Sequence, residues 1–263
     1  MKPSTTADLA FALKMAAVTT IAHAIAYLTH EFAHSFSAWA LGYMANPFAL
    51  DYGAPTPANL ILLFGVADNV AYEPILQGGH GLAAAAIALA GPLVGNGVLY
   101  IGLYLATRRL RAHRPLAAAW TFWLLAMCAG NIWSYVPIRA ITTHADIALA
   151  AQGLQISVFA LFPVLLVPAL LLVGHFFASA CPRLIPAMAQ GVTARAALVI
   201  ALTATWFFFL YGGAGLFGNY GAVSQAFSLV SILLLMPCAV VWLWHRCMTT
   251  PVSASATPPG RQY

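Results

Sequence analysis

Six apolar runs, each long enough to cross a lipid bilayer as a helix, constrain this chain more than any other feature. About 20 apolar residues span the hydrocarbon core, where only helices and closed barrels satisfy their own backbone. The chain is 62% hydrophobic and 6% charged, whereas soluble domains carry about 25% charged residues. The sequence therefore predicts an all-α polytopic membrane protein. The expected spans are about Ala7–Tyr43, Gly81–Ala106, Leu116–Pro137, Ala145–Ala178, Ala194–Phe217 and Val223–Trp244.

The segments between these spans are short, except for one loop after the first span. This loop, about Ala45–Gly79, is rich in Pro, Asn, Asp and Gly, and its apolar stretch Leu60–Val66 has the length of a strand. We expect a strand-like or re-entrant loop there. Pro163 and Pro168 are expected to kink the fourth span. Residues 1–248 then form one transmembrane domain, followed by a disordered tail over 249–263.

The net charge of +5 reflects membrane topology and not a nucleic-acid partner. The basic residues concentrate in one short loop between apolar runs, as in cytoplasmic loops, where they can also contact anionic lipid headgroups. That loop contains Arg108, Arg109, Arg111 and Arg114. If both termini are cytoplasmic, Arg139 is the one Lys or Arg residue that falls outside. Four of the six acidic residues then fall on or near the outer side, namely Asp51, Asp68, Glu73 and Asp146.

The first span contains the pattern H-E-x-x-H, formed by His30, Glu31 and His34. Residues four apart lie on one face of a helix about 6 Å apart along its axis, so both imidazoles can bind one Zn²⁺ ion. Glu31 is then placed as a general base for the water that the metal activates. The alternative is a polar capping cluster, or two histidines that serve helix packing. Ionisable groups at membrane depth are costly and usually functional, which favours the metal site.

A catalytic zinc site needs a third protein ligand, because the fourth position is left for water. Asp146 is the best candidate, since a carboxylate at the edge of the bilayer needs a partner. Alternatively, Asp146 caps the fourth span or pairs with Arg139, and His144 becomes the rival ligand. His23 lies about 10 Å along the helix from His30, too far to share one metal. We expect His23 to be a buried polar contact or a proton relay.

Two asparagines and a glycine-rich segment provide further candidates for the site. The second span contains Ala90-Gly91-Pro92-Leu93 and Asn96, where small residues allow close helix approach and a proline frees a carbonyl. The segment can face a substrate or form a packing kink. Asn131 in the third span can hydrogen-bond a substrate backbone or bridge two helices.

Together these motifs resemble the site-2 protease family of intramembrane zinc metalloproteases. The matching residues are His30, Glu31 and His34, then Ala90-Gly91-Pro92-Leu93 with Asn96, then Asn131, Pro137 and Asp146. The resemblance covers about Thr19–Gln152, and its third motif is spaced more loosely here than in the family. It implies one Zn²⁺ per chain, held by two His and one Asp, that hydrolyses a peptide bond in a transmembrane protein substrate. It also implies that a sheet or hairpin after the zinc helix receives the substrate, at the place of Leu60–Val66.

Three functions are compatible with these residues. In a protease, Glu31 takes a proton from the attacking water and passes it to the leaving amine, while Arg139 supports Asp146 or stabilises the oxyanion. The alternative is a catalytically inactive pseudoprotease that acts as a membrane binding or regulatory protein. A metal transporter ranks last, because the ionisable residues cluster at one end and are not strung through the spans.

Overall fold

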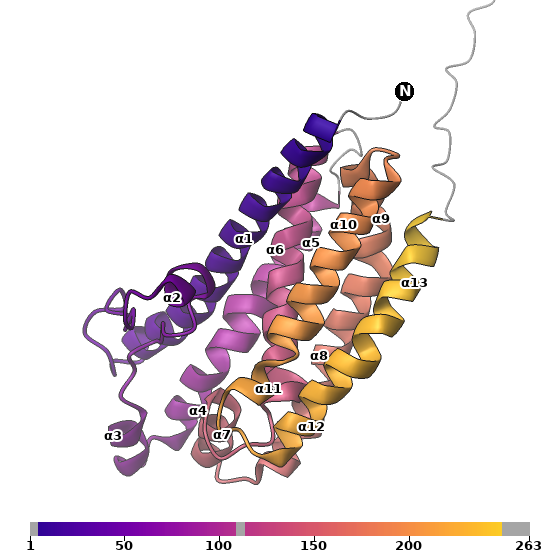
Figure 1. Cartoon of the computed structure of the whole chain (residues 1–263). Coiled ribbons are helices and arrows are strands. Elements are labelled where there is room, and N and C mark those ends of the chain that lie inside the picture. Colours follow the sequence, from indigo (N-terminus) through magenta and orange to yellow (C-terminus); the bar gives the residue numbers. More distant parts are fainter. Residues whose placement is uncertain (1–4, 109–113, 249–263) are drawn as a thin grey trace, which may run out of the picture.

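The computed structural model describes residues 5–108 and 114–248, and in this part of the chain it is helical with no β-strand (Figure 1). Six helical segments are long and apolar enough to cross a membrane, and each corresponds to one expected span. Their bounds are Thr6–Ala40, Gly81–Thr107, Pro115–Ile138, Val158–Ala189, Thr193–Tyr211 and Ala222–Met248. The predicted fold class, an all-α polytopic membrane protein, is confirmed. The tail 249–263, Arg109 and Arg111 lie outside the described residues.

Every span after the first, α1 (Thr5–Ala40), combines α-helix with a short π-helical segment. The second consists of α4 (Gly81–Ala90), η1 (Gly91–Val98) and α5 (Leu99–Thr107), and the third of α6 (Pro115–Trp133) and η2 (Ser134–Ile138). The fourth consists of α8 (Val158–His175), η3 (Phe176–Ala180) and α9 (Cys181–Ala189). The fifth consists of α10 (Thr193–Ala204) and η4 (Thr205–Tyr211), and the sixth of α12 (Ala222–Val230), η5 (Ser231–Leu235) and α13 (Met236–Met248). π-Helical turns concentrate at functional sites, and η1 adjoins the site described below; η2 is interrupted by a kink at Val136.

The third span is the central helix of the bundle. In its most apolar stretch 78% of the residues are buried inside the protein, against 17% for the sixth span. Phe122, Trp123, Leu125 and Met127 are fully buried on α6 and form the middle of the main hydrophobic core. The peripheral helices instead expose large apolar side chains, as expected for surfaces that face lipid.

The two ends of the bundle differ in charge. The short helices α2 (Pro57–Leu62), α3 (Tyr72–Gln77), α7 (Asp146–Gly153) and α11 (Ala214–Phe217) all lie toward the end away from the N-terminus; in Figure 1, α3 and α7 are near the bottom and α2 is at the left. Five of the six acidic residues belong to this end, at Glu31, Asp51, Asp68, Glu73 and Asp146. The sixth, Asp8, forms an ion pair with Arg195 at the opposite end, with an Oδ1–Nε distance of 2.9 Å.

The stretch Leu60–Val66, expected to be strand-like or re-entrant, forms the end of helix α2 and a turn. Thr56 caps this helix, because its hydroxyl accepts a hydrogen bond from the Asn59 amide at 3.1 Å, and Pro57 occupies the first helical position. Leu63 adopts a left-handed conformation that ends the helix. In the described part of the chain, strand pairing is limited to one isolated bridge between Asp51 and Ala67. Of the two alternatives, strand-like or re-entrant, the strand-like one was wrong, because capping residues outweigh the apolar run.

The fourth span begins later than expected. Residues 146–153 form the separate helix α7, and α8 begins at Val158 after a turn in which Gln155 has a positive φ and Ser157 caps the new helix. The chain therefore turns back between Pro137 and Asp146, as expected, but Asp146 is carried by a short helix outside the span. The helix α8 itself continues as an α-helix through Pro163 and Pro168.

Two glycines allow α7 to lie directly against α4. A Cβ atom added at Gly81 would collide with the backbone carbonyl of Gly153, and one added at Gly153 would collide with the carbonyl of Gly81. The close approach fixes the position of α7, and hence of Asp146 at its first turn. Small residues serve this purpose wherever helices approach closely in membranes.

We predict that Gly153→Leu destabilises the protein by about 1–3 kcal/mol, because the new side chain must force the two backbones apart. Thermal unfolding in detergent should show a lower midpoint. Gly174→Leu is the matched control, since a Cβ there meets nothing within 4 Å, and its effect should stay within about 0.5 kcal/mol. Equal midpoints for both variants would contradict the close-packed interface.

Candidate metal centre

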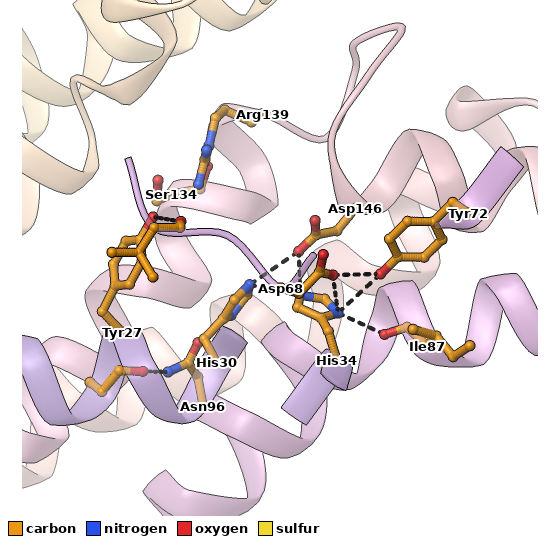
Figure 2. A network of polar contacts seen from close by, with 12 residues as sticks. Tyr27, His30, His34, Asp68, Tyr72, Ile87, Asn96, Ser134, Arg139 and Asp146 are labelled. Atoms are coloured by element: carbon orange, nitrogen blue, oxygen red, sulfur yellow. Dashed lines mark hydrogen bonds and ion pairs between the residues drawn. The ribbon is translucent and has the colours of Figure 1, made fainter. Parts of the chain in front are cut away.

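Three ligand atoms converge at the end of α1, where His30, His34 and Asp146 meet (Figure 2). Nε2 of His30 lies 3.1 Å from Asp146 Oδ2, and Nε2 of His34 lies 3.2 Å from the same oxygen. The two Nε2 atoms lie 3.1 Å from each other. Both histidines are buried, and the Asp146 side chain is 16% exposed. The sequence prediction that Asp146 faces the two histidines agrees with this geometry.

Hydrogen bonds determine which nitrogen of each imidazole faces the centre of this group. Asn96 donates its amide NH₂ to the Ala26 carbonyl at 3.0 Å, so its Oδ1 accepts from Nδ1–H of His30 at 2.8 Å. Nδ1–H of His34 donates to the Ile87 carbonyl at 2.7 Å. Each neutral ring therefore presents an unprotonated Nε2 to the centre.

A metal ion fits these three residues. With both Nδ1 atoms protonated, neither Nε2 carries a hydrogen, so their 3.1 Å contact is a repulsion between lone pairs. A cation among the three atoms removes that repulsion. Ligands of a tetrahedral zinc ion lie about 2.0–2.1 Å from the metal and hence about 3.3 Å from one another. The observed separations of 3.1–3.2 Å are close to that value. Two imidazoles and a carboxylate form a donor set that zinc accepts.

The environment of Asp146 keeps its carboxylate ionised. Burial opposes ionisation, but in the metal-free group positive charge on the imidazoles of His34 and His30 outweighs burial and holds the pKa of Asp146 below its ordinary range. A metal ligand has to be deprotonated, so the group presents the carboxylate in the required form.

Two glycines bring the second span against the metal-binding face of α1. A Cβ atom on Gly91 would collide with Nε2 of His34 and of His30, and one on Gly95 would collide with the backbone of Thr29 and His30. The glycines of this segment, identified in the sequence as a site for close approach, therefore give the second span access to the two imidazoles. The same approach places Asn96 at Nδ1 of His30.

Asp68 and Tyr72 extend the network around His34, and sequence reasoning did not assign them a role. Tyr72 donates its hydroxyl to Asp68 Oδ2 at 2.9 Å, and both side chains lie beside Nδ1 of His34, at 3.5 Å for Tyr72 and 3.9 Å for Asp68 (Figure 2). Burial and the Asp68 carboxylate raise the pKa of Tyr72, which keeps it a donor. The spacing of Asp68 and Tyr72 by four residues gave no signal, because Asp68 lies in the loop before the helix α3 and Tyr72 is the first residue of that helix.

Tyr135 is a second residue that sequence reasoning missed. Its ring stacks on His30 with a centroid separation of 4.5 Å, and the Arg139 guanidinium lies 4.2 Å from the centroid of the same ring. Tyr135 is buried at the start of η2, directly after the central helix. This ring restricts the orientation of the His30 imidazole from a side that Asn96 does not contact.

Of the remaining residues predicted for the site, Glu31 lies near the three ligands, and Asn131, Arg139 and His144 lie outside the group. Glu31 is 6% exposed and lies within the electrostatic reach of His34 and Asp146. No hydrogen-bond donor among residues 5–108 and 114–248 contacts its carboxylate, which is free to bind water. His23 also lies outside the group of three ligands.

His144, Arg139 and His23 have other partners. His144 stacks on Tyr220 at 4.7 Å, so it does not replace Asp146 as a ligand. Arg139 donates to the Ser134 carbonyl and the Tyr220 hydroxyl and makes no ion pair with Asp146. Arg139 therefore does not make the expected direct contact with Asp146.

His23 is a buried polar contact, as expected. Its Nε2–H donates to the Leu62 carbonyl at 3.0 Å, and its Nδ1 accepts from the Tyr211 hydroxyl at 2.8 Å. Asn131 is 3% exposed on α6, and its amide nitrogen has no hydrogen-bond partner. The two residues line a separate cavity, which is described below.

Comparisons with protein-family models, with curated proteins and with solved structures gave no match to this chain. The similarity to the site-2 protease family therefore rests on the motifs themselves. Within those motifs, His30, His34 and Asp146 meet in one group that can hold a metal ion.

We predict that purified protein binds one divalent metal ion and that His34→Ala loses most of it, because one of three ligands is removed. Elemental analysis of the purified protein measures the content. His144→Ala is the matched control, since its ring lies outside the group, and should keep the metal. Full occupancy in a His30→Ala/His34→Ala double variant would rule out this site.

A second prediction concerns the orientation of His30. Asn96→Ala should weaken metal binding by about 10–100-fold, because the hydrogen bond that fixes the imidazole is lost. Competition with a chelating indicator dye measures the affinity. Asn69→Ala removes a loop contact to the Ala49 carbonyl and should leave the affinity unchanged; an unchanged value for Asn96→Ala as well would assign Asn96 to helix packing alone.

Proposed function

We propose that this protein is an intramembrane zinc metalloprotease that hydrolyses a peptide bond in or near a transmembrane segment of a protein substrate. The observation that carries the proposal is the combination of two unprotonated imidazole nitrogens and a carboxylate around one point with an unpaired glutamate next in the chain. A site that only held a structural metal would have no use for Glu31 in that position.

The residues have separate roles in this proposal. His30, His34 and Asp146 hold the zinc ion, which when bound polarises the peptide carbonyl as a Lewis acid and makes water a stronger acid. Glu31 accepts the proton of the attacking water and delivers it to the leaving amine. Asn96 and Tyr135 keep the His30 ring in place, while the Ile87 carbonyl does so for His34.

An apolar cavity of about 480 Å³ next to the site supports a substrate that arrives from the bilayer. It lies between the second span and α8. Its wall includes Pro92 of the glycine-rich motif, Val136, which follows Tyr135, and Ile147, which follows Asp146. Such a cavity suits apolar side chains of a membrane-embedded peptide. The substrate helix must unwind locally before hydrolysis, since a helical peptide bond is shielded by its own hydrogen bonds.

The charge asymmetry of the bundle supports an orientation with both termini in the cytoplasm. The basic residues described at one end include Lys14, Arg108, Arg114, Arg183 and Arg246, and the positive-inside rule assigns that end to the cytoplasm. The metal site then opens toward the outer side.

Labelling of single cysteines with an impermeant reagent on intact cells tests this orientation, in a background without the four native cysteines. Asp68→Cys should react and Arg114→Cys should not, because only the first lies at the outer end. Permeabilised cells provide the control, since both positions should then react. The reverse pattern on intact cells would place the metal site on the cytoplasmic side.

Glu31→Gln separates an enzyme from an inactive relative on the same scaffold. We predict that the variant keeps its metal but loses hydrolysis of single-span peptides in liposomes, because an amide does not accept a proton from water at neutral pH. Glu73→Gln is the matched control: Glu73 is exposed and pairs with Gln77 at 2.7 Å, and its loss should leave activity unchanged. Undiminished turnover in Glu31→Gln would exclude this mechanism, and metal binding without any turnover in the wild type would favour a pseudoprotease.

A further inference from the structure

A second, polar cavity lies on the opposite side of the metal centre from Tyr72. It has a volume of about 220 Å³ and is enclosed by the first, third and fifth spans, the α2 segment and the turn around α11. In Figure 2, Arg139, Ser134 and Tyr27 lie together on this side of the site. All three residues line the cavity. Tyr135, which contacts both His30 and Arg139, connects it to the metal centre.

Arg139 brings a positive charge to this cavity without a carboxylate to balance it. The guanidinium donates to the Ser134 carbonyl at 3.1 Å and to the Tyr220 hydroxyl at 3.2 Å, and no acidic residue in the described part of the chain forms an ion pair with it. Guanidinium groups have five donors, so donors remain for a ligand.

Asn131 adds an unused donor to the same cavity. Its side chain is 3% exposed, and its amide nitrogen has no hydrogen-bond partner. Buried donors in native proteins are almost always paired, so an unpaired one that lines a cavity points to a missing acceptor. Several other polar groups on the wall are engaged, since both ring nitrogens of His23 and the Tyr27 hydroxyl have partners.

The remaining walls are apolar. Leu62, Phe64, Trp206 and Leu210 contribute the aliphatic and aromatic surface of the cavity. The occupant must therefore combine an anionic acceptor, which the guanidinium and the amide can hydrogen-bond, with a small hydrophobic group.

We propose that this cavity is a second ligand site, which binds a small organic carboxylate with an apolar substituent. The guanidinium of Arg139 and the amide of Asn131 bind the carboxylate, and the side chains around Trp206 enclose the substituent. This site does not depend on the proposed proteolytic function, because it uses none of the three metal ligands and does not use Glu31.

The probes are 4-methylpentanoate and its neutral counterpart 4-methylpentanamide, which have the same apolar group. Full-length protein is purified in detergent, stripped of metal with a chelator and held at constant ionic strength, and its thermal midpoint is measured against probe concentration. A ligand that binds only the folded state raises the midpoint with concentration. We expect a saturable rise with the carboxylate and none with the amide.

Variants of the two donors locate the effect. Arg139→Gln should weaken the apparent affinity for 4-methylpentanoate by about 10-fold or more, since it removes a charged hydrogen bond. Asn131→Leu should weaken it too, without lowering the midpoint of the ligand-free protein, because the unpaired amide contributes no hydrogen bond there. Arg183→Gln is the matched control: Arg183 also lies over a tyrosine ring, 5.4 Å from the Tyr104 centroid, but outside the cavity.

Three results would overturn the proposal. One is an equal effect of the amide and the carboxylate, which would indicate an apolar or solvent effect. Another is an undiminished response in Asn131→Leu and in Arg139→Met, the variant to use if Arg139→Gln does not fold. The third is a response that requires added zinc and disappears in His34→Ala, which would mean that the carboxylate binds the metal centre. Loss of protease activity or of metal with the carboxylate response intact would refute the proposed function alone.

Discussion

The Nε2 atoms of His30 and His34 face each other at 3.1 Å inside the bundle, both lack a hydrogen in the neutral rings, and the rest of the site depends on this contact. This contact arises because Nδ1 of each ring already donates a hydrogen bond, from His30 to Asn96 and from His34 to the Ile87 carbonyl. The carboxylate of Asp146 completes a group of three acceptors without a donor among them. Positive charge at the centre satisfies these acceptors, so the group can hold a metal ion, and hydrogen bonds made at its periphery orient the ligands.

Close backbone packing places those groups within reach of one another. Gly91 and Gly95 let the second span touch the histidine face of α1, while Gly81 and Gly153 let α7 lie on α4. Membrane helices gain little from the hydrophobic effect against one another, so close packing and polar contacts decide their arrangement. The geometry of the site thus depends on the small residues as much as on the ligands. Arg139 and Asn131 extend the polar region beyond the metal centre, into a cavity whose other walls are largely aromatic and uncharged.

The sequence predicted what depends on local pattern and missed what depends on tertiary contact. Apolar run length predicts the six spans, and the i, i+4 spacing of His30 and His34 predicts two ligands, because both follow from helix geometry. Asp146 was identified by the cost of a charge near the bilayer. Asp68, Tyr72 and Tyr135 were not, since loops and ring stacking leave no periodic signal. The helix α2 was mistaken for a strand because the Thr56 cap competes with an apolar run.

X-ray absorption at the zinc edge of the purified wild-type protein tests the central claim most directly. The account predicts a first shell of nitrogen and oxygen ligands at about 2.0–2.1 Å, with outer-shell scattering from two imidazoles and no sulfur. The four cysteines of the chain are the natural competitors for zinc, so a sulfur shell at about 2.3 Å would contradict the account. So would a spectrum with scattering from fewer than two imidazoles.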